Sequence, residues 1–204
     1  MKRPASDIAF SPSVKDVQTE RGSRSAYARL EQSGGGGFEE LVTDDLADFL
    51  ADIDTGFLAT ASADGQPYVQ HRGGPRGFIR ALDQHTLGFL DFAGNKHYIS
   101  TGNLRDNDRV CLLLIDYARR RRIKVWGTAR TVPATPELLA ALAVPGYRAR
   151  VEQVVLVTVS AWNVNCPQHI PQKLDASEVA DLVGSLRDRI AELEAENQRL
   201  RAAG

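Results

Sequence analysis

The sequence predicts a mainly β protein with flanking helices, built around a six-stranded antiparallel barrel. Three observations lead to this class. Six β-rich runs follow one another between residues 56 and 162. They are separated by turns and by only two short helical segments, whereas regular alternation of strands with helices would indicate a parallel sheet. Polar or helical stretches precede and follow this region, so the barrel is expected to carry an extension at each end.

Composition and charge limit the class of protein. The 204 residues are 43% hydrophobic and 25% charged, as in an ordinary globular protein, and the length suits one domain with extensions. A formal net charge of −1 gives no global attraction to nucleic acid or anionic membranes. No apolar run approaches the roughly 18 residues of a membrane span, and the first residues lack the apolar region of a secretory signal. Because Cys111 and Cys166 are too few for a disulfide framework, we expect reduced thiols and a cytoplasmic location.

Residues 1–40 are expected to form an N-terminal helical extension and a glycine-rich joint. A helix is predicted over residues 14–32, and the joint is the run GGGG at 34–37. Thr43 can then cap a second helix over 44–53, whose first turn carries two aspartates. The apolar face of that helix comprises Leu46, Phe49, Leu50 and Ile53.

The strands are predicted from β-rich runs bounded by turn residues. Asp64 and Gly65 are a strong hairpin signal between the first two runs. A short helix is expected within residues 94–107, and Pro136 opens another over 136–143. The six runs cover residues 56–62, 66–72, 86–92, 109–116, 123–132 and 153–162.

The C-terminal segment, residues 176–204, predicts a coiled-coil helix. Apolar side chains recur at heptad positions a and d, and the remaining positions are heavily charged. The alternative is a terminal helix that packs on its own barrel. Position a holds Val183, Ile190 and Asn197, and position d holds Leu186, Leu193 and Leu200.

One candidate binding segment is QHRGGPRGF, residues 70–78. Glycines beside arginines permit close approach of an anion, and arginine suits bidentate phosphate contact. The segment matches neither the Walker loop nor the dinucleotide fingerprint, so a solvated hairpin end is the alternative. The segment GNKHYIS strengthens the first interpretation: if Gly94 and Asn95 begin a helix, its free N–H groups and Lys96 converge on one anion.

Other charged and metal-binding patterns are weaker. Lys124 lies in an apolar strand and needs either a counter-ion, such as a phosphate, or an outward orientation, and the pattern does not decide between them. For Arg119 to Arg121 we favour a solvated turn. Cys166 and His169 have the spacing C-x-x-H without a second ligand pair, so no metal is expected. No G-x-S-x-G nucleophile motif is present.

The order of these segments resembles the pyridoxamine 5′-phosphate oxidase-like, FMN-binding split-barrel family. The resemblance covers roughly residues 41–173 and rests on FLATASADGQPYVQHRGGPRGF, LGFLDFAGNKHYISTGNLRDNDRVCLLLIDY, RRRRIKVWGTARTV and WNVNCPQHIPQK. It implies a six-stranded antiparallel split β-barrel in residues 41–173. It also implies a homodimer that binds two FMN molecules at the subunit interface.

The resemblance assigns the FMN-binding residues. A basic residue on the second strand and a lysine after the third hold the phosphate in this family, and these correspond here to Arg72 or its neighbour His71 and to Lys96. Further flavin contacts of the family correspond here to Arg122 and Lys124. In this family a late tryptophan and polar residues of the partner subunit often close the site, and they correspond here to Trp162, Gln168 and His169. The complete expected set is His71, Arg72, Gly73, Asn95, Lys96, Arg122, Lys124, Trp162, Gln168 and His169.

The expected function is that of an FMN-dependent oxidoreductase acting on a small molecule that the sequence does not identify. Pyridoxamine phosphate oxidases proper end in an arginine-bearing motif that binds the substrate phosphate, whereas this chain has CPQHIPQK and a charged helix. Oxidation of a vitamin B6 phosphate is therefore not expected. The alternatives are a flavin-binding or redox-responsive module without turnover, and a split barrel that uses deazaflavin or haem. No side chain stands out as a general acid or base.

Overall fold

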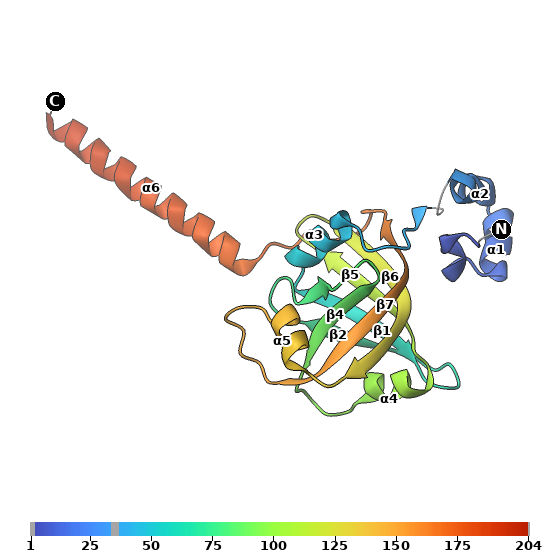
Figure 1. Ribbon diagram of the computed structural model, residues 1–204. Coiled ribbons are helices and arrows are strands. Elements are labelled where there is room, and N and C mark those ends of the chain that lie inside the picture. The colour runs from blue at the N-terminus through green and yellow to red at the C-terminus, as the bar shows by residue number, and fades with distance from the viewer. Residues whose placement is uncertain (1–2, 34–36, 204) are drawn as a thin grey trace. The chain divides into compact units, whose positions relative to one another are not determined.

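The computed structural model describes residues 3–33 and 37–203, and it divides into two compact units (Figure 1). The first unit comprises the described residues of Met1–Asp116 together with Arg121–Pro167. The second comprises Tyr117–Arg120 and the described residues of Gln168–Gly204. No helix in the described ranges is long and apolar enough to cross a membrane.

The first unit is built on one sheet of seven antiparallel strands, not six. Its order is β2-β1-β5-β6-β7-β4-β3. The additional strand, β3, has only three residues and pairs with β4, so it carries too little pattern to be read from sequence. The strands are β1 (Thr55–Ala61), β2 (Pro67–Gly73), β3 (Ile79–Ala81), β4 (Thr86–Phe92), β5 (Arg109–Asp116), β6 (Arg121–Val132) and β7 (Val151–Asn165).

The sheet curls around one apolar interior (Figure 1). Strands β1, β5 and β6 alternate buried and half-buried residues, which places one face of each strand in the core. The pairing register of β6 with β7 shifts at Gly127. A Cβ at Gly127 would lie 2.0 Å from the carbonyl oxygen of Thr158, so only glycine allows the two strands to approach there.

Three helices of the first unit pack on this sheet. They are α3 (Asp44–Asp52) against β3, α4 (Ile99–Asp106) against β1 and β6, and α5 (Pro136–Leu142) against β4. The predicted Thr43 cap is confirmed, because its hydroxyl accepts from the Leu46 N–H at 3.4 Å. The predicted apolar face of α3 is also confirmed, and Leu46, Phe49 and Leu50 are buried. The hairpin predicted at Asp64 and Gly65 joins β1 to β2.

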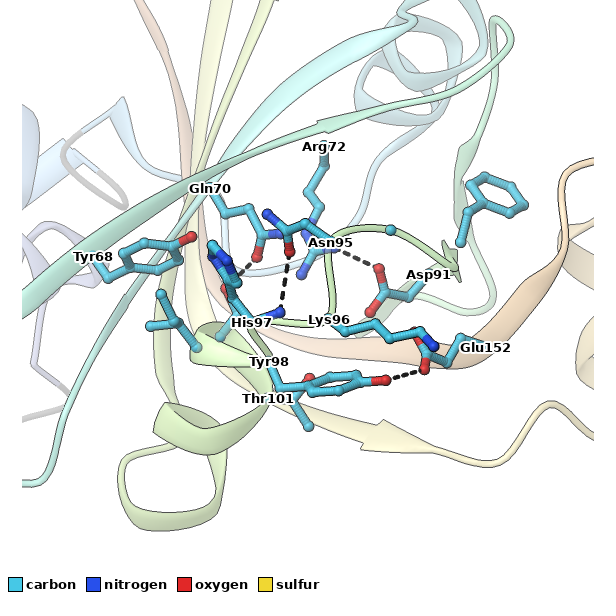
Figure 2. Close-up of a pocket in the computed structure, with 14 residues that line it drawn as sticks. Tyr68, Gln70, Arg72, Asp91, Asn95, Lys96, His97, Tyr98, Thr101 and Glu152 are labelled. Carbon is cyan, nitrogen blue, oxygen red and sulfur yellow. Dashed lines mark hydrogen bonds and ion pairs between the residues drawn. The ribbon is translucent and has the colours of Figure 1, made fainter.

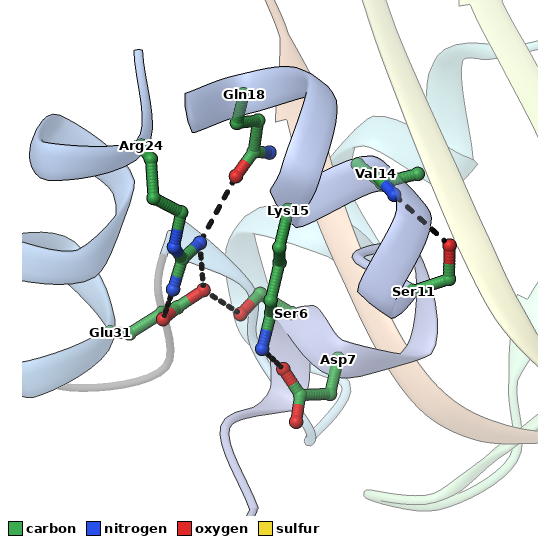
Figure 3. Close-up of polar contacts among 8 residues, drawn as sticks. All are labelled: Ser6, Asp7, Ser11, Val14, Lys15, Gln18, Arg24 and Glu31. Atoms are coloured by element: carbon green, nitrogen blue, oxygen red, sulfur yellow. Dashed lines mark hydrogen bonds and ion pairs between the residues drawn. The ribbon is translucent and has the colours of Figure 1, made fainter. Parts of the chain in front are cut away.

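The N-terminal segment contains η1 (Ala5–Ile8) and two helices, α1 (Pro12–Glu20) and α2 (Arg24–Ser33). The prediction of a single helix over residues 14–32 was wrong, because Gly22 adopts a left-handed φ of 77° and separates α1 from α2. The helices are joined by polar contacts (Figure 3), in which Arg24 forms an ion pair with Glu31 and also donates to Gln18 at 3.0 Å. The ring of Phe10 packs edge-on against Phe38, which contacts Trp126 of β6.

The arginine run after β5 differs from its sequence-based interpretation at one residue. Arg121 does not lie in a solvated turn but begins β6. Its Nη2 lies 2.5 Å from Asp45 Oδ2, and its guanidinium lies over the ring of Phe49, 5.2 Å from the centroid. An acidic first turn on α3 and an aromatic side chain one turn later therefore explain the position of this arginine.

The second unit contains the C-terminal helix α6 (Ala176–Ala203). The helix predicted from residue 176 onward is confirmed. Its pairing with another helix stays a prediction, because the structure contains one chain. The linker before the helix contacts Tyr117–Arg120 of the same unit, where Lys173 Nζ lies 4.3 Å from the centroid of the Tyr117 ring.

Candidate functional site

A pocket of about 260 Å³ opens between β2, β4, the loop that follows β4 and the start of α4 (Figure 2). Arg72, Asn95 and Lys96, three of the residues expected to bind FMN, all line it. The structure therefore brings together side chains that are more than twenty positions apart in sequence. The full lining is Tyr68, Gln70, Arg72, Asp91, Phe92, Gly94, Asn95, Lys96, His97, Tyr98, Ile99, Ser100, Thr101 and Glu152.

Arg72 is held in the pocket wall by Asp91. Its Nη1 donates to Asp91 Oδ1 at 2.5 Å, and the two side chains are only 13% and 11% exposed. Gln153 Nε2 donates to the other carboxylate oxygen at 2.8 Å and to Thr101 Oγ1 at 2.9 Å. The Arg72 Nε is buried and has no hydrogen-bond acceptor among the described residues. An orphaned donor of this kind costs about 1–3 kcal/mol, which an incoming acceptor could offset.

The loop before α4 does not begin a helix at Gly94 and Asn95, as the sequence-based prediction required. Lys96 and Tyr98 adopt left-handed φ values of 59° and 53°, which are incompatible with a continuous helix, so α4 begins at Ile99. Asn95 Oδ1 accepts from the His97 N–H at 3.1 Å and closes the turn. The first turn of α4 still faces the pocket, and Tyr98 at its N-cap makes no side-chain cap.

The pocket contains equal numbers of positive and negative side chains. Tyr98 Oη donates to Glu152 Oε1 at 2.5 Å, and this hydrogen bond raises the pKa of the tyrosine, with a smaller contribution from burial. Figure 2 shows the Lys96 side chain extending toward Glu152. The two formal positive charges, Arg72 and Lys96, are therefore accompanied by Asp91 and Glu152. A bound anion must compete with these carboxylates.

Two hydrogen bonds fix α4 to the sheet beneath the pocket. Ser100 Oγ donates to Gln70 Oε1 at 2.7 Å, and Asn103 Nδ2 donates to Thr60 Oγ1 at 3.0 Å. Ser100 and Thr60 are buried, so these bonds satisfy polar groups that would otherwise be costly. The start of the helix is thereby held at the pocket.

The other basic residues expected in the site lie on the opposite face of the sheet. Arg72 pairs across the strands with Gly56, and Gly56 pairs with the buried Leu114. His71 instead belongs to a row that crosses β2, β1, β5, β6 and β7, and paired residues in such a row project to the same side. We call this side the outer face; that row is His71, Phe57, Leu113, Lys124 and Asn163.

The remaining expected site residues are placed as follows. Arg122 pairs with Ile115 on the outer face, and His71 Nε2 lies 2.7 Å from Thr55 Oγ1. Gly73 ends β2 beside His71 and does not line the pocket. Trp162 is 4% exposed in the core, and its Nε1 donates to the Leu41 carbonyl at 2.7 Å. Gln168 and His169 belong to the second unit.

Sequence reasoning missed the acidic and aromatic residues of the pocket, namely Asp91, Glu152 and Tyr98. Asp91 breaks the apolar pattern of the run TLGFLDF and could have been marked as a strand residue that needs a partner. Glu152 had no comparable signal, because an acidic residue at the start of a strand is common. Only the pairing of β4 with β7 brings Asp91 beside Gln153, next to Glu152.

A sequence model of the pyridoxamine 5′-phosphate oxidase family matches residues 42–170, more than half of the chain. The chain belongs to this family. The match spans the seven strands and the whole pocket. The family membership expected from the sequence motifs is thereby confirmed. Comparison with curated proteins gave no match.

Comparison with solved structures finds proteins that are similar to this chain but have low sequence identity to it. HupZ of Group A Streptococcus is 18% identical with a TM-score of 0.49, covering 65% of this chain and 99% of that one. An F420 reductase is 21% identical with a TM-score of 0.43, covering 60% and 98%. An FAD binding protein from Mycobacterium smegmatis is 17% identical with a TM-score of 0.40, covering 62% and 98%. All three TM-scores lie below 0.5, so the family assignment rests on the match of the sequence model to residues 42–170 and not on these structures.

Proposed function

We propose that this member of the pyridoxamine 5′-phosphate oxidase family binds FMN and acts as a flavin-dependent oxidoreductase on a small molecule. The observation that carries the proposal is the convergence of Arg72, Lys96 and the uncapped first turn of α4 on one pocket. These are three kinds of group that bind phosphate: a guanidinium, an ammonium and helix N–H groups.

The pocket residues fit the phosphate end of the cofactor. The buried Nε of Arg72 lacks an acceptor among the described residues, and Lys96 is exposed at the pocket mouth. Gly94 offers room beside them, since a Cβ there would meet nothing closer than 3.9 Å. We therefore assign the phosphate to Arg72 and Lys96, with Asn95 shaping the loop.

The size of the pocket supports a cofactor shared between two copies of the chain. Pockets that enclose a drug-sized ligand typically have about 300–1,000 Å³, and this one has about 260 Å³. We propose that the remainder of the flavin extends out of the pocket mouth and is covered by the outer face of the partner subunit in a homodimer. Val69 is 59% exposed on this face, and Phe57, Leu113 and Ile115 of the same face are only half-buried. Arg122, Lys124 and His71 of that face are our candidates for contacts to the partner's flavin.

The isoalloxazine ring would supply the redox chemistry by exchanging two electrons and a proton with the substrate. The residues of the chain would bind and orient it. Glu152 accepts a hydrogen bond from the Tyr98 hydroxyl at the pocket edge, and this contact raises the pKa of the tyrosine. Oxidation of pyridoxamine phosphate itself is not proposed, because the arginine-bearing terminal motif is replaced by CPQHIPQK.

The visible spectrum of the purified protein, alone and after addition of FMN, tests this proposal. Bound oxidised flavin gives absorption in the blue, and reduction by a suitable donor under anaerobic conditions should bleach it. A Soret band would instead identify haem, and bound deazaflavin would be identified by mass after release. Either result would overturn the FMN assignment. Bound FMN that no donor reduces faster than free FMN would favour a module without turnover.

A further inference from the structure

The C-terminal helix α6 carries an apolar stripe that nothing in its own unit covers among the described residues. Leu186, Ile190, Leu193 and Leu200 are 54%, 55%, 42% and 66% exposed. Together with Val183 and Asn197 they recur at alternate spacings of three and four residues, the repeat of a two-stranded coiled coil and not that of a helix lying on a globular core. The helix has 28 residues, enough for about three heptads after Val183 is taken as position a.

We propose that α6 binds the α6 of a second copy of this chain as a parallel, in-register coiled coil. The occupant is another copy because the stripe is complementary to itself. Ile190 at position a, with leucines at every d position from Leu186 to Leu200, is the combination that favours two strands. The pairing requires no flavin and does not rest on the proposed function.

The charges beside the stripe favour association but do not fix its direction. In the parallel arrangement Arg189 faces Glu194 of the partner subunit, and Glu196 faces Arg201 of the partner subunit, so both pairs attract. Full antiparallel overlap would also place opposite charges together, because Arg189 would then meet the partner's Glu196. Arg189 now bonds Glu192 at 2.9 Å within its own helix, but both side chains are more than 60% exposed, so this contact is weak.

Asn197 decides the direction. In a parallel, in-register pair it occupies position a in both helices, and the two amides can bond each other across the seam. In an antiparallel coil a positions face d positions, and in this helix those are Val179 and the leucines at 186, 193 and 200. Each amide would then be buried against an apolar side chain without a partner, which is unfavourable. The two Asn197 side chains therefore disfavour antiparallel pairing.

The direction has a consequence for the subunits. Parallel pairing brings the two copies of Ala176 side by side, so both chains enter the coil at the same end. Antiparallel overlap of a 28-residue helix would separate these residues by about 40 Å. Only the parallel coil holds the two preceding domains together at one end.

Cysteine cross-linking of the full-length protein tests the proposal while Asn197 stays in place. Both native cysteines are first removed as Cys111→Ala and Cys166→Ser. Leu200→Cys then places one thiol at position d, where parallel helices bring the two copies within disulfide reach. Gln198→Cys, two residues away at the outward position b, is the matched control. Both sites are exposed, so neither substitution should disturb folding.

Under mild oxidation the Leu200→Cys protein should run mainly as a covalent dimer on non-reducing gels, and the Gln198→Cys protein mainly as a monomer. Equal, low cross-linking of both variants would overturn the pairing. An antiparallel coil would instead cross-link Leu200→Cys to Val183→Cys when the two proteins are mixed and equilibrated. Preferential formation of that mixed dimer would overturn the direction.

Discussion

Arg72 and Asp91 form an ion pair of 2.5 Å at the wall of the pocket that we assign to a phosphate. The arginine is therefore already partly neutralised before any ligand binds, and its free donor is the buried Nε. This arrangement holds the guanidinium in position, but it also places a carboxylate beside the incoming anion. If Asp91 is replaced by a neutral residue, the first effect predicts weaker binding of FMN and the second predicts tighter binding.

We predict that Asp91→Asn tightens FMN binding by at least about fivefold at low salt. The amide retains the shape of the carboxylate and an oxygen that Arg72 can bond, while the repulsion between two negative groups is removed. The gain should shrink as salt is raised, because screening weakens the original repulsion. Calorimetric titration checks this, with Asp108→Asn, an exposed acid outside the pocket, as the control. Weaker binding would mean that Asp91 acts chiefly by orienting Arg72.

A second prediction concerns Lys96, which is exposed and has a φ of 59°. Alanine would strain this left-handed backbone, so Lys96→Asn is the cleaner test, because asparagine tolerates it. We expect about a tenfold loss of FMN affinity with an unchanged melting temperature of the apo protein. Arg130→Gln, an exposed cation on β6, serves as the control. Unchanged affinity in the Lys96 variant would place the phosphate elsewhere.

The strands and helix caps were predictable because local pattern determines them. Thr43 caps its helix as its position before an acidic turn indicates, the helix expected from Pro136 begins at that residue, and the boundaries of β4 and β5 match the apolar runs. The errors arose where single residues override the pattern. Gly22 breaks one helix, and the left-handed residues Lys96 and Tyr98 delay the start of another.

The site was only partly predictable, since its chemistry depends on tertiary pairing. Sequence motifs identified Arg72 and Lys96, but not the carboxylates beside them. Strand alternation alone shows that His71 and Arg72 point to opposite faces, so at most one of them can line a given pocket. The position of α4 was needed to decide which of these two side chains lines the pocket.

The two cysteines should differ in reactivity. Burial raises the pKa of the Cys111 thiol, with a smaller opposing effect of Lys124, so less reactive thiolate is present at neutral pH. Cys166 is exposed. We predict one fast and one slow phase when the native protein reacts with an aromatic disulfide reagent at neutral pH. Cys166→Ser should remove the fast phase, and two equally fast thiols would contradict the burial of Cys111.

The N-terminal helices should lose stability in acid. The hydrogen bond from Arg24 lowers the pKa of Glu31, so the ion pair stabilises the fold above the unfolded carboxyl pKa of about 4.3. This stabilisation is lost as the pH falls through the lower, folded value. Nuclear magnetic resonance of the α2 amides should therefore show loosening below about pH 4, and Glu31→Gln should show it already at pH 6. Insensitivity of α2 to both changes would show that the ion pair contributes little.

The central claim is that the pocket of Arg72 and Lys96 binds the phosphate of FMN, and the most direct test is to compare FMN with riboflavin. Riboflavin carries the same ring and lacks only the phosphate. Charge-assisted contacts to phosphate contribute about 1.5–3 kcal/mol each, so calorimetric titration of the apo protein should give at least a tenfold tighter Kd for FMN. Lys96→Asn should reduce the ratio of the two Kd values, because it should weaken the binding of FMN and leave that of riboflavin unchanged. Equal affinities for FMN and riboflavin in the native protein would contradict the account.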